Sequence, residues 1–154
     1  MERWKSSKNP RVRIISTGDE LLPVSEELKP GKIRNSSAYM LQGFLRQWGI
    51  TADIYGIVRD DEDAIKDALT ACLADADCVI TTGGASVGDY DLALSSMEGI
   101  GAEVLFWQVR MKPGMATLAA VKGRQAFIGP FRQSICSGGC FIFAGASRIP
   151  QNVR

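Results

Sequence analysis

The sequence predicts an α/β fold in three layers, with a mixed, mostly parallel sheet between helices. Short apolar runs typical of strands alternate with segments whose apolar residues recur at helical spacing. The last two runs flank Lys122-Gly123-Arg124, which is typical of a hairpin turn and adds antiparallel pairing to the sheet. The chain has 154 residues, of which 45% are hydrophobic and 23% charged, as expected for one globular domain.

The expected strands are apolar runs bounded by glycine, proline or acidic residues. They cover residues 12–15, 50–58, 78–82, 104–109, 117–121 and 126–128. Between the first two strands, residues 22–33 contain two prolines and a glycine and are interpreted as a loop.

Three helices are expected. For the first, Asn35 or Ser36 is a suitable N-cap and Gly49 a suitable terminator. Its apolar positions at helical spacing are Met40, Leu41, Phe44, Leu45 and Trp48. The second helix follows an acidic run, and its apolar face is formed by Ala64, Ile65, Ala68, Leu69 and Leu73. The third helix covers residues 92–100.

Composition excludes several classes of function. A formal net charge of +1 gives no indication of a nucleic-acid partner, and no apolar run is long enough to span a membrane. The N-terminus has no apolar signal core, so a cytoplasmic location is expected. The absence of histidine rules out a Ser-His-Asp or Cys-His mechanism within this chain. Cys72 and Cys78 are expected to be core thiols, whereas Cys136 and Cys140 match no usual zinc or disulfide framework.

The stretch Ile80-Thr81-Thr82-Gly83-Gly84-Ala85-Ser86-Val87-Gly88-Asp89-Tyr90-Asp91 carries the main functional signal. A buried strand ends in small residues, whose glycines allow a tight turn and close approach to a ligand. Backbone N–H groups and hydroxyls there form an anion cradle, and two aspartates follow it. Such a loop suggests a phosphate-bearing ligand with a divalent cation. The alternative interpretation is a glycine-rich surface turn.

Ser16-Thr17-Gly18-Asp19-Glu20-Leu21 repeats this pattern of strand, hydroxyls, glycine and acids. Two such loops at the ends of parallel strands would face each other across a crevice. Asp60 or Asp61 caps the second helix, and two interpretations stay open. Either the acid caps the helix only, or it also faces the ligand crevice.

Taken together, these motifs resemble the molybdopterin-binding domain of the MoeA family, which is also the E domain of gephyrin. The motifs occur in the family's order: the Ser16–Leu21 loop, Arg59-Asp60-Asp61, the Thr82–Gly88 loop and Lys112-Pro113-Gly114. The resemblance covers about residues 10–129. Relatives of the MogA adenylyltransferase type and CinA-like proteins share the fold but differ in the loop sequence after the Gly-Gly pair, and they remain alternatives.

The resemblance implies insertion of molybdate into adenylylated molybdopterin, with Mg²⁺ and release of AMP. Implied catalytic residues are Glu20, Asp60, Asp61, Asp91 and Lys112. Implied metal ligands are Glu20, Asp61 and Asp91, which suit a hydrated Mg²⁺. Implied ligand-binding residues are Ser16, Thr17, Gly18, Asp19, Thr82, Gly83, Gly84, Ser86, Val87 and Gly88. The implied partner is a small pterin or nucleotide ligand, and the family also implies a homo-oligomer.

The sequence departs from the family pattern at three places. Gln108 and Met115 stand where basic residues are common, and Asn35-Ser36 stands where an aspartate is common. The two missing cations, at Gln108 and Met115, would weaken binding of a dianion, and the family's other domains are not recognised.

Residues 130–154 have no clear period and lack the family's Gly-Asn-Pro loop. One choice of codons for residues 130–140, read one base later, encodes Leu-Ser-Gly-Asn-Pro-Ser-Ala-Ala-Val-Ala. We therefore hypothesise a frameshift. The expected organisation is a flexible N-terminus over residues 1–10, a molybdopterin-binding domain over 11–129 and an atypical tail over 130–154. Three functions follow: a molybdotransferase-like domain, a non-catalytic pterin- or nucleotide-binding module, or an inactive truncated product.

Overall fold

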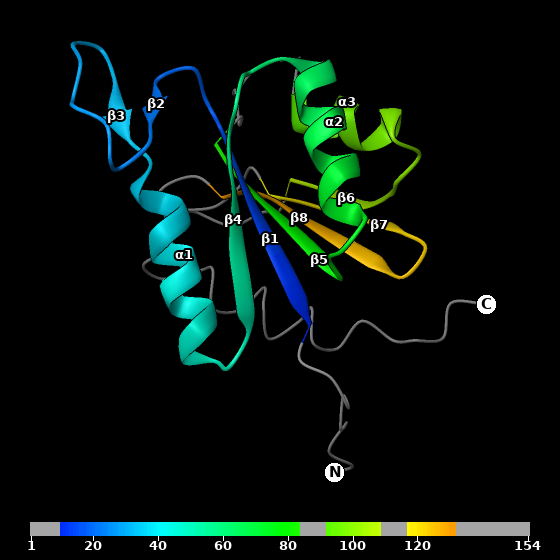
Figure 1. Ribbon diagram of the computed structural model, residues 1–154. Coiled ribbons are helices and arrows are strands. Elements are labelled where there is room, and N and C mark those ends of the chain that lie inside the picture. Colours follow the sequence, from blue (N-terminus) through cyan, green and yellow to red (C-terminus); the bar gives the residue numbers. More distant parts are fainter. Residues whose placement is uncertain (1–9, 84–91, 109–116, 132–154) are drawn as a thin grey trace.

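The computed structural model describes residues 10–83, 92–108 and 117–131 (Figure 1). The strands in this part of the chain are β1 (Arg11–Thr17), β2 (Leu21–Leu22), β3 (Ile33–Arg34), β4 (Thr51–Val58), β5 (Cys78–Thr82), β6 (Glu103–Trp107), β7 (Leu118–Lys122) and β8 (Gln125–Phe131). The helices are α1 (Ser36–Gln47), α2 (Glu62–Leu73) and α3 (Leu92–Gly99). The predicted alternation of strands and helices, and the hairpin, are confirmed.

Six strands form one sheet in the order β4-β1-β5-β8-β7-β6. Strands β4, β1, β5 and β8 are mutually parallel, while β7 runs antiparallel to both β8 and β6. Because β6 is antiparallel to β7, it points in the same direction as the four parallel strands. The carboxyl ends of β1, β4, β5 and β6 therefore lie at one edge of the sheet, as expected for a ligand site in this type of fold.

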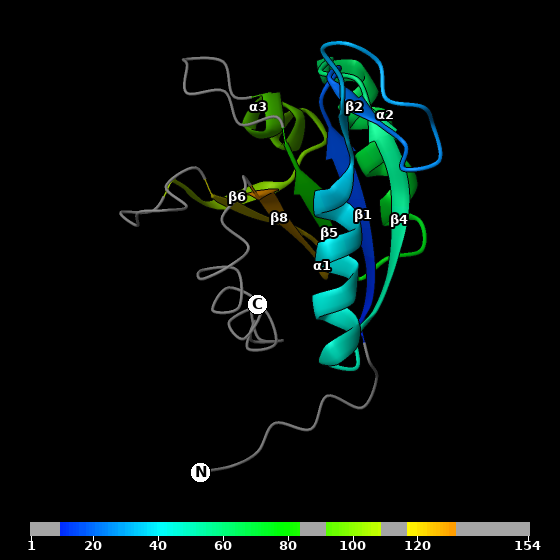
Figure 2. The same cartoon turned by 90° about the vertical axis from the view of Figure 1, so that its left-hand side faces the viewer.

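Helices cover both faces of the sheet, which confirms the predicted three layers. Helix α1 lies on one face, and α2 and α3 lie on the other (Figures 1 and 2). The core on the α1 face includes Ile14, Leu41, Leu45 and Ile80. The core on the opposite face is larger, and its fully buried side chains include Ile15, Leu69, Val79, Met97, Leu118 and Phe127.

Helix α1 contacts the sheet along a narrower stripe than predicted. Its buried residues are Ala38, Leu41 and Leu45, which are spaced by three and four positions. Met40 and Trp48 were expected on the apolar face but are 42% and 44% exposed. Met40 lies off this stripe, and Trp48 is the C-cap residue, just beyond the end of the helix.

The interpretation of residues 22–33 as a loop is wrong at both ends. Leu21–Leu22 and Ile33–Arg34 form a two-stranded parallel sheet, β2 and β3, outside the main sheet. Strands of two residues give no periodic signal, so their pairing follows from the hydrogen bonds that close the segment. The amide of Ile33 donates to the carbonyl of Glu20 at 2.8 Å.

Paired polar groups secure the amino end of the sheet. The guanidinium of Arg13 on β1 donates two hydrogen bonds to the carboxylate of Asp75, which precedes β5. The backbone amide of Arg11 donates to Asp77 Oδ2 at 2.8 Å. Gln125, the first residue of β8, donates its side-chain amide to the carbonyls of Leu73 and Ala76. These bonds connect the starts of three adjacent strands.

The two cysteines in the described ranges are free and buried, as predicted for core thiols. Burial raises the pKa of Cys72 to about 11 and that of Cys78 to about 12, so both stay protonated at neutral pH. Among the described helices, none is long and apolar enough to cross a membrane.

Candidate functional site

The predicted site segments begin at the carboxyl edge of the sheet. The first loop follows β1, the acidic run follows β4, and the Gly-rich loop follows β5. Residue Ser16 of β1 is in register with Thr82 of β5, so these two loops start side by side. The amide of Gln108, directly after β6, donates to the carbonyl of Thr117 at 2.8 Å. This bond holds both ends of the segment that contains Lys112 near the same edge.

Three buried side chains are hydrogen-bonded in series at this edge, on the α1 face. The hydroxyl of Thr82 donates to Ser16 Oγ at 2.9 Å, and Ser16 Oγ donates to Asn35 Oδ1 at 3.1 Å. None of the three residues is more than 4% exposed. Of the two predicted candidates, Asn35 occupies the N-cap position of α1, but its side chain makes no cap hydrogen bond. Its oxygen is already engaged by Ser16.

Two other buried hydroxyls at this edge have no hydrogen-bond partner among the described residues: Thr17 Oγ1 and Thr81 Oγ1. Both residues are at most 4% exposed. Gly83 packs against Thr17, and Gly129 packs against Thr81, so neither position has space for a side chain. A Cβ on Gly83 would lie 2.0 Å from the carbonyl oxygen of Thr17, and one on Gly129 would lie 1.8 Å from Thr81 Oγ1. Unsatisfied buried polar groups are costly, so a polar ligand or water is the expected partner.

Carboxylates gather beside the first loop. Burial, followed by the negative charges of Glu20 and Asp19, raises the pKa of Asp60 above its usual value. Gly18 has a φ of +144°, and a Cβ there would lie 2.6 Å from Glu20 Oε2. The carboxylate of Glu20 therefore lies close to the backbone of Gly18. The structure brings three acids from two loops near one another.

Asp61 has a different role from its neighbour. It occupies the N-cap position of α2, and its Oδ1 accepts a hydrogen bond from the amide of Ala64 at 2.9 Å. The predicted cap is thus confirmed and assigned to Asp61. Asp60, by contrast, is coupled electrostatically to Glu20 and Asp19.

The remaining predicted residues are outside the described ranges: Gly84, Ser86, Val87, Gly88, Asp91 and Lys112. Within those ranges, no three acidic or thiol side chains are grouped so that they could hold a metal ion by themselves. Mg²⁺ often uses only one or two carboxylates, together with water and ligand phosphates. The carboxylates of Glu20 and Asp60 fit that requirement, because a cation would relieve their mutual repulsion.

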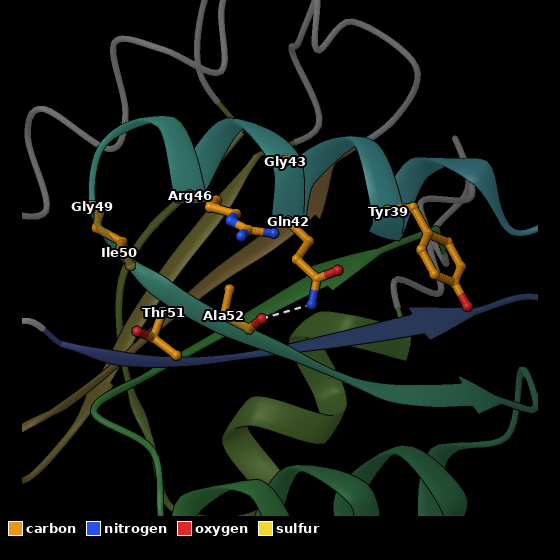
Figure 3. A pocket seen from close by; sticks show the side chains of 8 residues that line it. All are labelled: Tyr39, Gln42, Gly43, Arg46, Gly49, Ile50, Thr51 and Ala52. Atoms are coloured by element: carbon orange, nitrogen blue, oxygen red, sulfur yellow. Dashed lines mark hydrogen bonds between the residues drawn. The ribbon is translucent and has the colours of Figure 1, made fainter.

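A separate open cleft of about 450 Å³ lies between α1 and the start of β4 (Figure 3). Its lining residues are Tyr39, Gln42, Gly43, Arg46, Gly49, Ile50, Thr51 and Ala52. None of the predicted site residues lines it. Gln42 spans it and donates its side-chain amide to the carbonyl of Ala52 at 2.7 Å, as Figure 3 shows.

The sequence identified Thr81 only as one hydroxyl residue of the Gly-rich stretch, and Asn35 only as a candidate cap and a departure from the family pattern. Asn35 was interpreted as a cap, and only its contact with Ser16, 19 positions away in the chain, reveals its other use. Thr81 lies next to the predicted residue Thr82, but successive side chains of a strand point to opposite faces, and the face on which the Thr81 hydroxyl lies is known only from the folded sheet.

Comparison with known proteins connects this geometry to molybdenum cofactor biosynthesis. Residues 13–143 match the family described as "Probable molybdopterin binding domain". A molybdopterin molybdenumtransferase of Staphylococcus epidermidis is 38% identical over 138 residues, which are 89% of this chain and 33% of that protein. This chain thus spans about a third of the length of the curated relatives that it matches.

Solved structures show the same relationship. The molybdopterin biosynthesis MoeA protein from Pyrococcus horikoshii is 30% identical, with a TM-score of 0.71 over 79% of this chain and 29% of that one. The molybdopterin biosynthesis enzyme MoaB from Thermus thermophilus is 17% identical, with a TM-score of 0.58, covering 77% of this chain and 79% of that one. The second likeness concerns the fold alone.

Proposed function

This chain belongs to the molybdopterin binding domain family, and we propose that it binds adenylylated molybdopterin together with Mg²⁺ at the carboxyl edge of β1, β4 and β5. In this proposal the domain contributes to the insertion of molybdate, the second substrate, with release of AMP. The relatives named molybdopterin molybdenumtransferase support this reaction class.

The observation that carries the proposal is the group of acids around Asp60. Its pKa is raised by burial and by two neighbouring carboxylates, an arrangement that destabilises the empty site. A divalent cation would convert this repulsion into attraction, and ligand phosphates would complete its coordination. Perturbed carboxylates beside buried hydroxyls are characteristic of functional sites.

Particular residues take particular roles in this proposal. Glu20 and Asp60 hold the hydrated Mg²⁺, with Asp91 as a third ligand. Asp61 caps α2 and keeps Asp60 in place. The amides of the two Gly-containing loops and the hydroxyl of Thr17 bind ligand oxygens, since Thr17 Oγ1 has no partner among the described residues. Lys112 supplies positive charge for phosphate or molybdate.

A second candidate is a module that binds the pterin without turning it over. Binding is what the matched family's description names, and the match to the relatives with the enzyme name covers about a third of their length. Affinity without turnover would support this candidate, whereas Mg²⁺-dependent release of AMP in the presence of molybdate would support the transferase.

The deciding experiment is calorimetric titration of the purified chain with adenylylated molybdopterin, with and without Mg²⁺. We expect binding that requires Mg²⁺ and that is lost in Asp60→Asn and in Asp91→Ala, while both variants stay folded. Equal binding with and without Mg²⁺ would contradict the proposed metal site, and no binding at all would contradict the proposed function.

A further inference from the structure

The side chain of Asn35 accepts a hydrogen bond from another strand instead of capping its own helix. It occupies the N-cap position of α1, with φ −70° and ψ 75°, but makes no side-chain cap. An asparagine at this position typically stabilises a helix by accepting an amide hydrogen bond. Here Oδ1 instead accepts from Ser16 Oγ, so the helix forgoes a stabilising contact that its residue could provide.

The same residue connects three segments that border the site. Through Ser16 it is linked to Thr82, and so to the ends of both β1 and β5. Its backbone amide donates to the carbonyl of Leu22 at 2.9 Å, which ties it to the strand that follows Glu20. All of this lies in a buried environment, where hydrogen bonds are strong and a missing partner is costly.

We propose that Asn35 is a positioning residue for the ligand site, which fixes the carboxyl end of β1 and the loop that follows it relative to the carboxyl end of β5. It does so as the final acceptor of the Thr82–Ser16–Asn35 series, without touching the ligand itself. The inference rests on the function proposed above for this edge. Loops held in the binding geometry before the ligand arrives lose less entropy on binding, and small displacements of such groups are costly.

A neutral amide suits this role for an electrostatic reason. The edge already carries Asp19, Glu20 and Asp60, and the pKa of Asp60 is raised by burial and then by the charges of the other two. A carboxylate at position 35 could accept the same hydrogen bond but would add negative charge. The amide provides the acceptor oxygen without that charge.

The first test needs no ligand. Asn35→Leu keeps the approximate size of the side chain but removes the acceptor, whereas Asn35→Asp keeps an acceptor. The control is Gln42→Leu, which removes the hydrogen bond from the Gln42 side-chain amide on α1 to the carbonyl of Ala52. This bond lies in a cleft that no predicted site residue lines. We expect Asn35→Leu to speed amide hydrogen exchange at residues 18–20 and 83 about tenfold, equivalent to about 1.4 kcal/mol. Gln42→Leu should leave these amides near the wild-type rates, and Asn35→Asp, which keeps the acceptor but adds charge, should lie between Asn35→Leu and the wild type.

Equal exchange at these amides in Asn35→Leu and Gln42→Leu would overturn the proposal. If Asn35→Leu does not fold, Asn35→Ser provides the same comparison. A serine can cap α1, but its hydroxyl is too short to replace the contact with Ser16. The helix should then be as stable as in the wild type while the two loops still exchange faster.

The second test measures affinity for adenylylated molybdopterin with Mg²⁺. Loss of a positioning residue should weaken binding about 10- to 100-fold in Asn35→Leu, by analogy with outer-shell residues of metal sites. Gln42→Leu should bind like the wild type. Wild-type affinity in Asn35→Leu would overturn the positioning role. If the wild-type chain itself does not bind, the proposed function fails, and the exchange experiment alone decides the role of Asn35.

Discussion

The two ends of the central sheet are built on different principles. At the amino end, Arg13 pairs with Asp75, and Gln125 donates to two carbonyls. At the carboxyl end, Thr17 and Thr81 carry hydroxyls without partners among the described residues. There, Asp60 has a carboxyl group whose pKa is raised by burial and like charges. The amino end satisfies its own polar groups, and the carboxyl end leaves groups that a ligand can satisfy.

This difference is expected when a fold separates stability from function. Binding groups that are preorganised for a ligand are strained or unsatisfied in its absence, and the rest of the domain compensates. Variants at the carboxyl end should therefore change ligand binding, sometimes with a gain in stability. Variants at the amino end should change stability alone.

The largest effect is expected for Gly83→Ala. Gly83 has a φ of +86°, and a Cβ would lie 2.0 Å from the backbone oxygen of Thr17, which cannot move without shifting β1. Backbone strain and overpacking together should lower the free energy of unfolding by about 3 kcal/mol or more. Urea denaturation measures this.

The matched control is Gly49→Ala, at the end of α1. Gly49 has a φ of +74°, but no atom lies within 4 Å of a Cβ there. Its cost should be only about 1 kcal/mol, from the left-handed conformation. Equal losses in the two variants would show that the loops are not closely packed at Gly83.

The next effect concerns Asp61→Ala. Loss of the N-cap of α2 should cost about 1 kcal/mol in the free energy of unfolding, while a folded variant keeps Mg²⁺-dependent ligand binding. Chemical denaturation and calorimetric titration of the same variant test both parts. Loss of Mg²⁺ binding at full stability would assign the ligand-facing role to Asp61 instead of Asp60.

Asp60→Asn should raise the stability of the folded state at neutral pH, whereas the variants above lower it. Because the folded pKa of Asp60 lies above its unfolded value, the folded state binds this proton more tightly. Stability therefore falls as the pH rises from the unfolded pKa through the raised folded pKa, and stays lower above it. The asparagine variant should be more stable than the wild type at neutral pH, and this advantage should disappear at acid pH. Unfolding midpoints measured across this pH range would contradict the account if the variant were never the more stable.

The smallest effect is expected for Arg13→Gln. Its ion pair with Asp75 is partly exposed, so its contribution is modest and should shrink with added salt. The hydrogen bonds from Arg13 lower the pKa of Asp75, so the stability they give is present above the unfolded pKa and is lost as the pH falls through the folded one. This pH dependence is opposite to that of Asp60. A profile of the same sign in both variants would break the contrast between the two ends.

The sequence alone predicts those strands, turns and helix caps that depend on local residue patterns. Runs such as Cys78-Val79-Ile80 are apolar throughout because parallel strands are buried on both faces, and all three residues are buried. The hairpin at Lys122-Gly123-Arg124 and the cap before α2 follow from turn and capping chemistry.

Features that depend on tertiary contacts could not be predicted in this way. Asn35 is a good cap by local chemistry, yet its oxygen is taken by a serine on another strand. Met40 and Trp48 were expected on the apolar face, but Met40 lies off the buried stripe of α1 and Trp48 is the C-cap residue, where the helix has ended. Asp60 and Asp61 are equivalent in the sequence, and the structure distinguishes them by the N-cap geometry of Asp61 and by the carboxylates near Asp60.

The most direct test of the contrast is the rise in the unfolding midpoint caused by adenylylated molybdopterin and Mg²⁺ in three proteins. A ligand that binds the folded state stabilises it according to its concentration and affinity. We expect the same rise in the wild type and in Arg13→Gln, and little or none in Asp60→Asn, even though that variant starts out more stable. A rise in Asp60→Asn equal to that of the wild type, or its loss in Arg13→Gln, would contradict the assignment of binding to the carboxyl end.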